Sequence, residues 1–153
     1  MIHILYVDDE ELLLDLAKLF LERNGEFVVD TSITAVGLAE SPSIRSYDAI
    51  ISDYLMPDMD GIEFLKKIRE KYPEMPFILF TGRGREEVVI EAINNGADFY
   101  LQKGGEPKAQ FAELSHKVMQ AVKRRQAEKE LLESEQRFSK AFHANPAIAG
   151  LSD

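Results

Sequence analysis

Acidic side chains directly follow two of five short apolar segments in this sequence, and a hydroxyl and an ammonium group follow two others. Asp8 and Asp9 come after the first segment, Asp53 after the third, Thr81 after the fourth and Lys103 at the end of the fifth. If these segments are parallel strands of one sheet, the residues after them meet at the edge where such sheets bind ligands. Three carboxylates that meet there repel one another and raise one another's pKa unless a cation lies among them. The pattern therefore predicts a cation site.

The available donor atoms indicate which cation this is. The chain has no cysteine and no suitably spaced pair of histidines, so the candidate ligands are all oxygens. Mg²⁺ prefers oxygen ligands, typically takes one or two carboxylates, and completes its shell with waters and phosphate oxygens. Lys103 and Thr81 would then neutralise and hydrogen-bond a phosphoryl group. Asp53 is the expected nucleophile, and its attack on phosphorus would form an aspartyl phosphate.

The segments that must position these residues alternate between strand and helix. The strand-like segments are apolar almost throughout and rich in β-branched or aromatic residues, and amphipathic helical patterns separate them. Such alternation predicts a doubly wound α/β domain, in which a parallel sheet is covered on both faces. The predicted strands are Ile2–Val7, Phe27–Thr31, Ala49–Ser52, Phe77–Phe80 and Phe99–Leu101, and the predicted helices are Glu10–Asn24, a weaker one at 34–41, Gly61–Tyr72, Arg85–Asn95 and a last one from Pro107.

Composition and charge exclude several classes of protein. The 153 residues are 45% hydrophobic and 29% charged, as in ordinary globular domains, and the lack of cysteine excludes disulfides and zinc–thiolate sites. Residues 1–107 carry 21 acidic and 10 basic side chains, and residues 108–153 carry 6 and 8, so clustered positive charge for nucleic acid is absent. No apolar stretch approaches the ~18 residues of a membrane span. A soluble, cytoplasmic protein that binds neither nucleic acid nor membrane is expected.

Four motifs resemble those of the response-regulator receiver domain of two-component signalling. They occur in the order and at the intervals of that family, over residues 1 to about 123. The resemblance implies a flavodoxin-like, five-stranded parallel sheet with strand order 2-1-3-4-5 and a C-terminal helical extension. The motifs are Ile4-Leu5-Tyr6-Val7-Asp8-Asp9-Glu10, Asp53-Tyr54-Leu55-Met56-Pro57-Asp58-Met59-Asp60-Gly61, Phe80-Thr81-Gly82 and Gly96-Ala97-Asp98-Phe99-Tyr100-Leu101-Gln102-Lys103.

The resemblance also implies a function and a set of roles. The domain would accept a phosphoryl group on Asp53 from a phosphohistidine of a sensor histidine kinase or phosphotransfer protein, in a Mg²⁺-dependent reaction that Lys103 and Thr81 assist. It would then switch a downstream sensor or output module, as a signalling domain rather than an enzyme, although the full-length protein could carry a kinase module. Mg²⁺ would be held by Asp8, Asp9, Asp53 and the main-chain carbonyl of Leu55, and Thr81 and Tyr100 would form the switch pair.

Two departures from the family pattern affect these expectations. Gly104 and Gly105 follow Lys103 where most receivers have a proline, so the turn that positions the ammonium group is expected to be looser. Leu55 and Arg83 occupy the two positions that tune the lifetime of the phosphate in this family. An apolar Leu55 cannot orient an attacking water, which predicts slow self-dephosphorylation.

The C-terminal part of the chain has a different pattern. We expect a receiver domain at 1–123, a helical linker at 124–137 and, at 138–153, the truncated start of a domain that resembles a PAS sensor. The alternative is a frayed C-terminal helix that ends the protein naturally. A homodimer is expected through the C-terminal helix, with Leu131, Leu132 and Phe138 in contact, or through the face formed by the helix at 85–95, the strand at 99–101 and the helix from 107.

Two other functions use similar residues. A phosphohydrolase of the haloacid dehalogenase type also needs an acidic strand end, a threonine and a lysine, but requires an Asp-x-Asp pair that Asp8-Asp9-Glu10 does not provide. A phosphorylation-independent adaptor would keep the fold without the chemistry, and the retention of the whole acidic set argues against it. Turnover of a phosphate ester would favour the first alternative, and failure to bind Mg²⁺ would favour the second.

Overall fold

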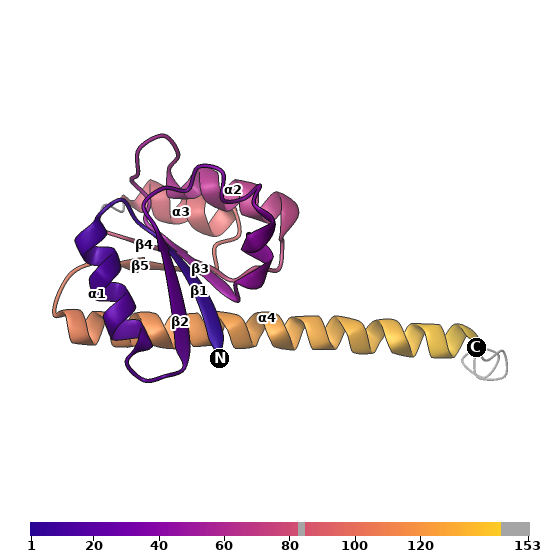
Figure 1. Ribbon diagram of the computed structural model, residues 1–153. Coiled ribbons are helices and arrows are strands. Elements are labelled where there is room, and N and C mark those ends of the chain that lie inside the picture. The colour runs from indigo at the N-terminus through magenta and orange to yellow at the C-terminus, as the bar shows by residue number, and fades with distance from the viewer. Residues whose placement is uncertain (83–84, 145–153) are drawn as a thin grey trace. The chain divides into compact units, whose positions relative to one another are not determined.

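Five parallel strands form a single sheet in the part of the chain that the structure describes. The computed structural model describes residues 1–82 and 85–144, with the side chains of residues 1–82 and 85–139. The strand order is β2-β1-β3-β4-β5 (Figure 1), which confirms the predicted doubly wound fold. The strands are β1 (Ile2–Val7), β2 (Phe27–Ser32), β3 (Ala49–Ser52), β4 (Phe77–Thr81) and β5 (Phe99–Gln102).

The strands are apolar because helices cover both faces of the sheet. Every residue of β3 and β4 is buried, as expected for the inner strands of a parallel sheet. At the end of β1, Val7 pairs with Ser32 of β2 on one side and with Ser52 of β3 on the other. The carboxyl ends of these three strands are therefore level, and the residues that follow them begin at the same edge of the sheet.

Among the described residues, the α-helices that connect or follow the strands are α1 (Glu11–Glu22), α2 (Gly61–Lys71), α3 (Glu86–Asn94) and α4 (Pro107–Ala144). A capping box starts α2, in which the Asp60 side chain accepts from the N–H of Glu63 and the Glu63 side chain accepts from the N–H of Asp60. The helix ends at Lys71, and Tyr72 has left the helical conformation because the position before a proline, here Pro73, disfavours helical geometry. The predicted helix at 61–72 is thus confirmed almost to the residue.

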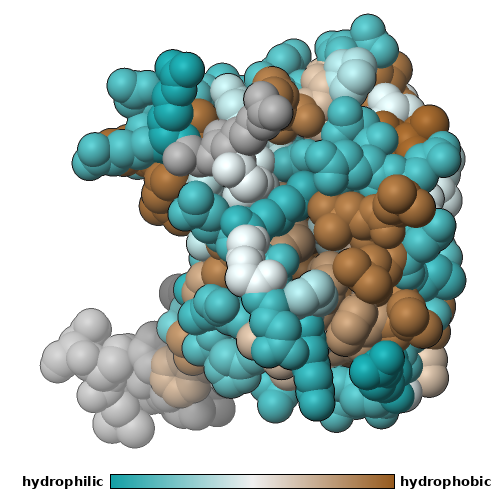
Figure 2. Space-filling view, turned by 90° about the vertical axis from the view of Figure 1, so that its left-hand side faces the viewer, coloured by the Kyte–Doolittle hydropathy of each residue, from teal (hydrophilic) through white to brown (hydrophobic). Residues whose placement is uncertain are grey.

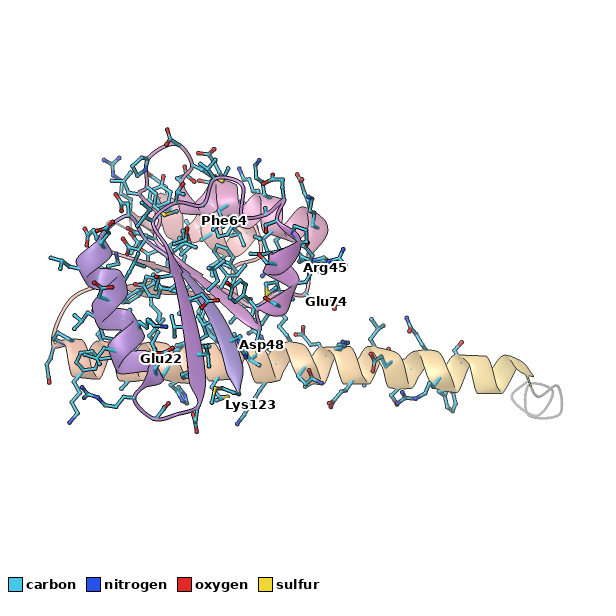
Figure 3. All side chains as sticks on the ribbon, in the orientation of Figure 1. Glu22, Arg45, Asp48, Phe64, Glu74 and Lys123 are labelled. Carbon is cyan, nitrogen blue, oxygen red and sulfur yellow. The ribbon has the colours of Figure 1, made fainter. Side chains whose placement is uncertain are left out.

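Two hydrophobic clusters pack against opposite faces of the sheet. One contains residues of α2 and α3, among them Phe64, which Figure 3 labels. The ring of Phe64 packs edge-to-face on Phe77 of β4, with ring centroids 5.7 Å apart. The other contains residues of α1 and of the first turns of α4, where Phe20 stacks on Phe111 at 5.4 Å. Each helix therefore presents its apolar stripe to the sheet.

The predicted helix at 34–41 is wrong. This segment forms successive turns and leads into a short 3₁₀ helix, η1 (Pro42–Ser46). Gly37 has a φ of +80°, which lies in the left-handed region and interrupts an α-helix. The hydrogen bonds of the segment span three residues, as from the N–H of Leu38 to the carbonyl of Ala35. The first residue of η1 is a proline, which cannot donate the bond that a continuing helix would need.

The last helix, α4, extends beyond the sheet domain in sequence. Contacts within the chain divide it into a unit at Met1–Val122 and a second at Lys123–Asp153. The motif Asn145–Gly150, on which the expected PAS domain partly depends, lies outside the described residues, so that expectation stays a prediction. No helix among the residues that the structure describes has the length and apolarity needed to cross a membrane.

Candidate phosphoacceptor site

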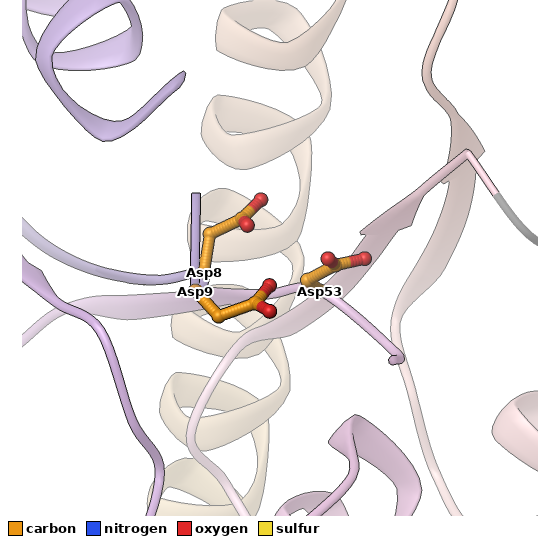
Figure 4. Close-up of side chains that lie close together, drawn as sticks. All are labelled: Asp8, Asp9 and Asp53. Carbon is orange, nitrogen blue, oxygen red and sulfur yellow. The ribbon is translucent and has the colours of Figure 1, made fainter. Parts of the chain in front are cut away.

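Three carboxylates converge at the carboxyl edge of the sheet. One carboxylate oxygen from each of Asp8, Asp9 and Asp53 lies within 4.8 Å of the others. Figure 4 shows the carboxyl groups of Asp9 and Asp53 turned toward the same space. Asp8 is fully buried, Asp53 is nearly so, and Asp9 is exposed, so the cluster opens to solvent on the side of Asp9.

Hydrogen bonds place the backbone of these residues with little freedom. The N–H of Asp8 donates to the main-chain carbonyl of Ser32 at 3.0 Å, and the N–H of Asp53 donates to the main-chain carbonyl of Val7 at 2.9 Å. The N–H of Lys103 likewise donates to Thr81 at 3.0 Å. These bonds extend the sheet by one residue beyond its strands, so each side chain starts from a position that the sheet itself determines.

The Lys103 ammonium group forms ion pairs with two of the three clustered carboxylates, those of Asp8 and Asp53. Its Nζ lies 2.6 Å from Oδ2 of Asp8 and 3.4 Å from Oδ2 of Asp53, and only 16% of its side chain is exposed. Charge-assisted hydrogen bonds of this kind are stronger than neutral ones. The ammonium group thus compensates part of the negative charge, and it contacts the same carboxylate that the sequence predicts to be the nucleophile.

Burial of the cluster disturbs the titration of Asp8. The pKa of this carboxyl is raised from 3.8 to about 6, first by desolvation and to a smaller extent by the charge of Asp53, against the hydrogen bonds from Lys103 and from the N–H of Glu10. Burial, followed by the charge of Asp8, also raises the pKa of Tyr6, which lies under the cluster two residues earlier in β1. The site therefore holds more negative charge than its protein partners neutralise.

The loop between β3 and α2 forms one wall of the site. The N–H of Tyr54 donates to Oδ1 of Asp53 at 2.8 Å, and the N–H of Gly61 donates to the carbonyl of Tyr54 at 2.8 Å. A Cβ on Gly61 would lie 2.2 Å from the carbonyl oxygen of Asp53, so only glycine lets the start of α2 approach Asp53 this closely. No role for Gly61 was predicted from the sequence, although a glycine at the start of a helix is a visible signal of close approach.

These walls enclose an open cleft of about 540 Å³. The predicted site residues Asp9, Asp53, Thr81 and Lys103 all line it, and so does Leu55, whose side chain is half exposed. Tyr100 lies outside the lining, on the strand beside β4. The full lining is Asp9, Glu10, Asp53, Leu55, Met56, Pro57, Thr81, Gly82 and Lys103.

Tyr100 packs against the cluster of side chains on the α2 and α3 face. Its hydroxyl is buried and has no hydrogen-bond partner among the described residues. Burial, and then the charge of Asp53, raises the pKa of this phenol. A buried hydroxyl without a hydrogen-bond partner lowers the stability of the folded protein. A conformation in which the Tyr100 hydroxyl found a partner would therefore be favoured by that hydrogen bond.

The donor set fits a hard divalent cation. All three clustered groups are carboxylates, the cleft is open on one side, and the residual negative charge favours a cation. Mg²⁺ characteristically combines one or two carboxylates with waters in such sites. The main-chain carbonyl of Leu55 stays a predicted ligand.

Replacing Asp8 with Asn should stabilise the protein in Mg²⁺-free buffer near neutral pH. Because its pKa is raised in the folded state, Asp8 contributes most stability when protonated, and that contribution is lost as the pH rises from about 4 to about 6. Urea denaturation near pH 7 should show a gain of at most about 3 kcal/mol for Asp8→Asn. Asp9→Asn, at an exposed position, should show a smaller gain. A loss of stability in Asp8→Asn would contradict this account.

Comparisons with known proteins agree with this geometry. The sequence pattern of the family described as "Response regulator receiver domain" matches residues 4–115. Response regulator Rre1 of Synechocystis is 33% identical over 128 residues, which cover 82% of this chain and 54% of Rre1. The chain spans about half the length of the curated relatives it matches.

Solved structures show the same arrangement. A receiver domain protein from Clostridium thermocellum is 32% identical, with a TM-score of 0.73, over 86% of this chain and 99% of that one. The receiver domain of NtrC4, solved as a beryllofluoride-activated dimer, is 29% identical, with a TM-score of 0.68, over 79% of this chain and 99% of that one. With the family pattern matched over most of its length, this chain belongs to the response regulator receiver domains of two-component signalling.

Proposed function

We propose that this receiver accepts a phosphoryl group on Asp53 from a phosphohistidine. The observation that carries the proposal is the position of the Lys103 ammonium, which contacts both Asp53 and Asp8 in a cleft open to solvent. In the reaction a carboxylate oxygen of Asp53 attacks phosphorus and forms a P–O bond. The P–N bond of the donor breaks, and the imidazole leaves with the electron pair and takes a proton.

The residues of the cleft assist this transfer in different ways. Lys103 would neutralise charge on the phosphoryl oxygens as they approach Asp53, and the hydroxyl of Thr81, which lines the same cleft, would donate a hydrogen bond to one of them. Asp8, Asp9, Asp53 and the carbonyl of Leu55 would hold Mg²⁺, which supplies the positive charge that lets a phosphoryl anion enter an acidic site.

We further propose that Thr81 and Tyr100 respond to phosphorylation. Movement of the Thr81 hydroxyl toward the new phosphoryl oxygens would change the space beside β5, where the Tyr100 hydroxyl is buried without a partner among the described residues. A local electrostatic change would thereby shift the populations of two conformations of the aromatic ring.

The direct test is incubation with acetyl phosphate and Mg²⁺, followed by intact mass measurement. Wild type should gain one phosphoryl group, and Asp53→Ala should gain none because the nucleophile is missing. Asp58→Ala, which removes a carboxylate from the same loop but not from the cleft, serves as the control and should be labelled. A phosphoryl group retained in Asp53→Ala would show that another residue is the acceptor.

The same experiment separates the two alternative functions. A phosphohydrolase would turn over many equivalents of a phosphate ester, whereas a receiver is labelled stoichiometrically. An adaptor that works without phosphorylation would show no label, and no Mg²⁺-dependent change in its thermal midpoint. The lack of an Asp-x-Asp pair after β1 argues against the phosphohydrolase, and the contact of Lys103 with Asp53 argues against an adaptor that has lost the chemistry.

The phosphorylated state should persist for minutes or longer. The Leu55 side chain lines the cleft and is apolar, so it offers no hydrogen bond to orient an attacking water. Leu55→Asn should accelerate dephosphorylation several-fold, measured as loss of the phosphoryl mass after removal of acetyl phosphate. Leu19→Asn, at an exposed leucine of α1, should leave the rate unchanged. Decay of the wild type within seconds would contradict the prediction.

We propose a histidine kinase or phosphotransfer protein as the phosphoryl donor. Apolar residues gather in a patch on the side of the molecule where α1 lies (Figure 2), and α1 exposes Leu12 and Leu19. Leu12 is in the first turn of α1, shortly after Asp9 and Glu10 of the cleft. A partner protein that bound this apolar patch would reach the cleft. Leu12→Asp should lose phosphoryl transfer from a cognate kinase but should still be labelled by acetyl phosphate, and that result would support this patch as the kinase-binding surface. Equal transfer would contradict it.

We propose that the second unit of the chain pairs with a second copy. Leu131 and Phe138 lie seven residues apart on α4, are exposed by 61% and 72%, and form one apolar stripe with Leu132. NtrC4, whose activated receiver is a dimer, supports self-association within the family. The face formed by α3, β5 and α4 is the other candidate, since Ile90 and Ile93 are exposed on α3.

Light scattering tests the pairing. The protein with beryllofluoride should have the mass of a dimer, and a double change of Leu131→Glu and Phe138→Glu should return it to a monomer because charge replaces the apolar stripe. Gln136→Glu adds charge to another side of the same helix and should leave the dimer intact. A monomeric wild type, with and without beryllofluoride, would contradict the proposal.

We propose a PAS sensor as the module that follows the linker and a cytoplasmic location for the protein. The resemblance over residues 132–150 supports the first, and the lack of a membrane-spanning helix among the described residues is compatible with the second. An experimental structure of the protein that includes the region after residue 138 tests whether this module is a PAS sensor. A PAS sheet would support it, and any other fold would contradict it.

A further inference from the structure

The loop that follows Lys103 has little to restrain it. Gly104 and Gly105 have φ of +142° and +84°, and an added Cβ would meet no atom within 4 Å at either position. Glycine has the greatest backbone freedom of any residue. Gly104 and Gly105 also have no side chain of their own, and no neighbouring atom lies close enough to restrain their backbone by packing. The backbone beside Lys103 must therefore be held by hydrogen bonds if the ammonium group is to keep its position.

One side chain supplies such bonds. Nε2 of Gln110 donates to the carbonyl of Gln102 at 3.2 Å and to the carbonyl of Gly104 at 2.9 Å. These two carbonyls stand on either side of Lys103 in the chain. Gln110 lies in the first turns of α4, and the next residue, Phe111, is buried and stacks on Phe20. The amide thus ties the loop to a part of the helix that is anchored in the core.

We infer that Gln110 is a positioning residue for Lys103. From one side, the N–H of Lys103 is bonded to Thr81 of β4; from the other, the carbonyls that flank Lys103 are bonded to α4 through Gln110. The backbone of Lys103 is then held between a strand and a helix while its Nζ reaches Asp8 and Asp53. The inference rests on the proposed function, because it assigns Gln110 a part in phosphoryl transfer that acts through Lys103.

A role in stability alone makes a different prediction. Both carbonyl acceptors and the amide lie near the surface, where each hydrogen bond contributes about 1 kcal/mol or less to the free energy of unfolding. Phosphoryl transfer is more sensitive, because displacement of a catalytic group by ~1 Å can lower a rate up to ~100-fold. Loss of the Gln110 amide should therefore affect the rate much more than the stability.

The experiment compares the phosphorylation rates of four proteins with acetyl phosphate and Mg²⁺. Gln110→Ala removes the amide, and Gln110→Glu keeps its shape but cannot donate to the carbonyls. Both should be phosphorylated about five- to tenfold more slowly than wild type, with thermal midpoints within a few degrees of it. Gln126→Ala is the matched control, since it removes an amide that donates to Glu130 on the same helix, and should react at the wild-type rate.

Hydrogen exchange shows whether the loop beside Lys103 alone has loosened, and the rate of phosphorylation at an unchanged thermal midpoint distinguishes positioning of Lys103 from a merely structural role. In Gln110→Ala and Gln110→Glu, the amides of Gly104 and Gly105 should exchange faster, while those of β4 and of the Phe111 turn stay unchanged. The affinity for Mg²⁺, measured by its effect on the thermal midpoint, should also stay within twofold, because none of the three clustered carboxylates is altered.

The outcomes separate this inference from the proposed function. If the wild type is labelled and both Gln110 variants react at its rate, the inference is wrong and the proposed function stands. Slow reaction accompanied by general loss of stability and faster exchange throughout the domain would also overturn it, since that pattern indicates unfolding. A wild type that gains no phosphoryl group would overturn both.

Discussion

The central constraint in this protein is the repulsion among three carboxylates that the sheet brings within 4.8 Å of one another. Water cannot screen Asp8, which is fully buried, and the pKa of its carboxyl is raised to about 6 for that reason first. Lys103 offsets part of this charge through its contacts with Asp8 and Asp53. The arrangement lowers stability locally and leaves negative charge in the cleft that Lys103 does not fully offset.

The order of the strands explains how such a cluster forms. Asp8 and Asp53 follow β1 and β3, which are neighbours in the sheet, so their carboxylates start one strand spacing apart. Lys103 follows β5, which is separated from β1 by β4 and β3. Its long side chain must cross the carboxyl edge of the sheet to reach Asp8, and the cleft lies along this path. A small displacement of the β5 end would therefore move the ammonium relative to both carboxylates.

Features of the backbone near the site help to position Asp53 and Lys103. Gly61 allows α2 to start against the carbonyl of Asp53, and the hydrogen bond from the N–H of Tyr54 orients the Asp53 carboxylate. After Lys103, two glycines leave the loop without packing, and the Gln110 amide bonds to the carbonyls on both sides of the lysine. One side of the site thus depends on close packing, and the other depends on a side chain that ties a loose turn to a helix.

The sequence by itself determined the strands, the parallel fold and the identity of the groups that meet at its edge, because apolar runs that end in Asp8, Asp53 or Lys103 are local patterns. It failed at 34–41, where apolar spacing suggested a helix but Gly37 turns the backbone the other way. Only the tertiary structure decided how deeply Asp8 is buried, which carboxylates Lys103 contacts, and that Gln110 reaches the carbonyls beside it. Those properties arise from residues distant in the sequence, whose separation in space no local pattern specifies.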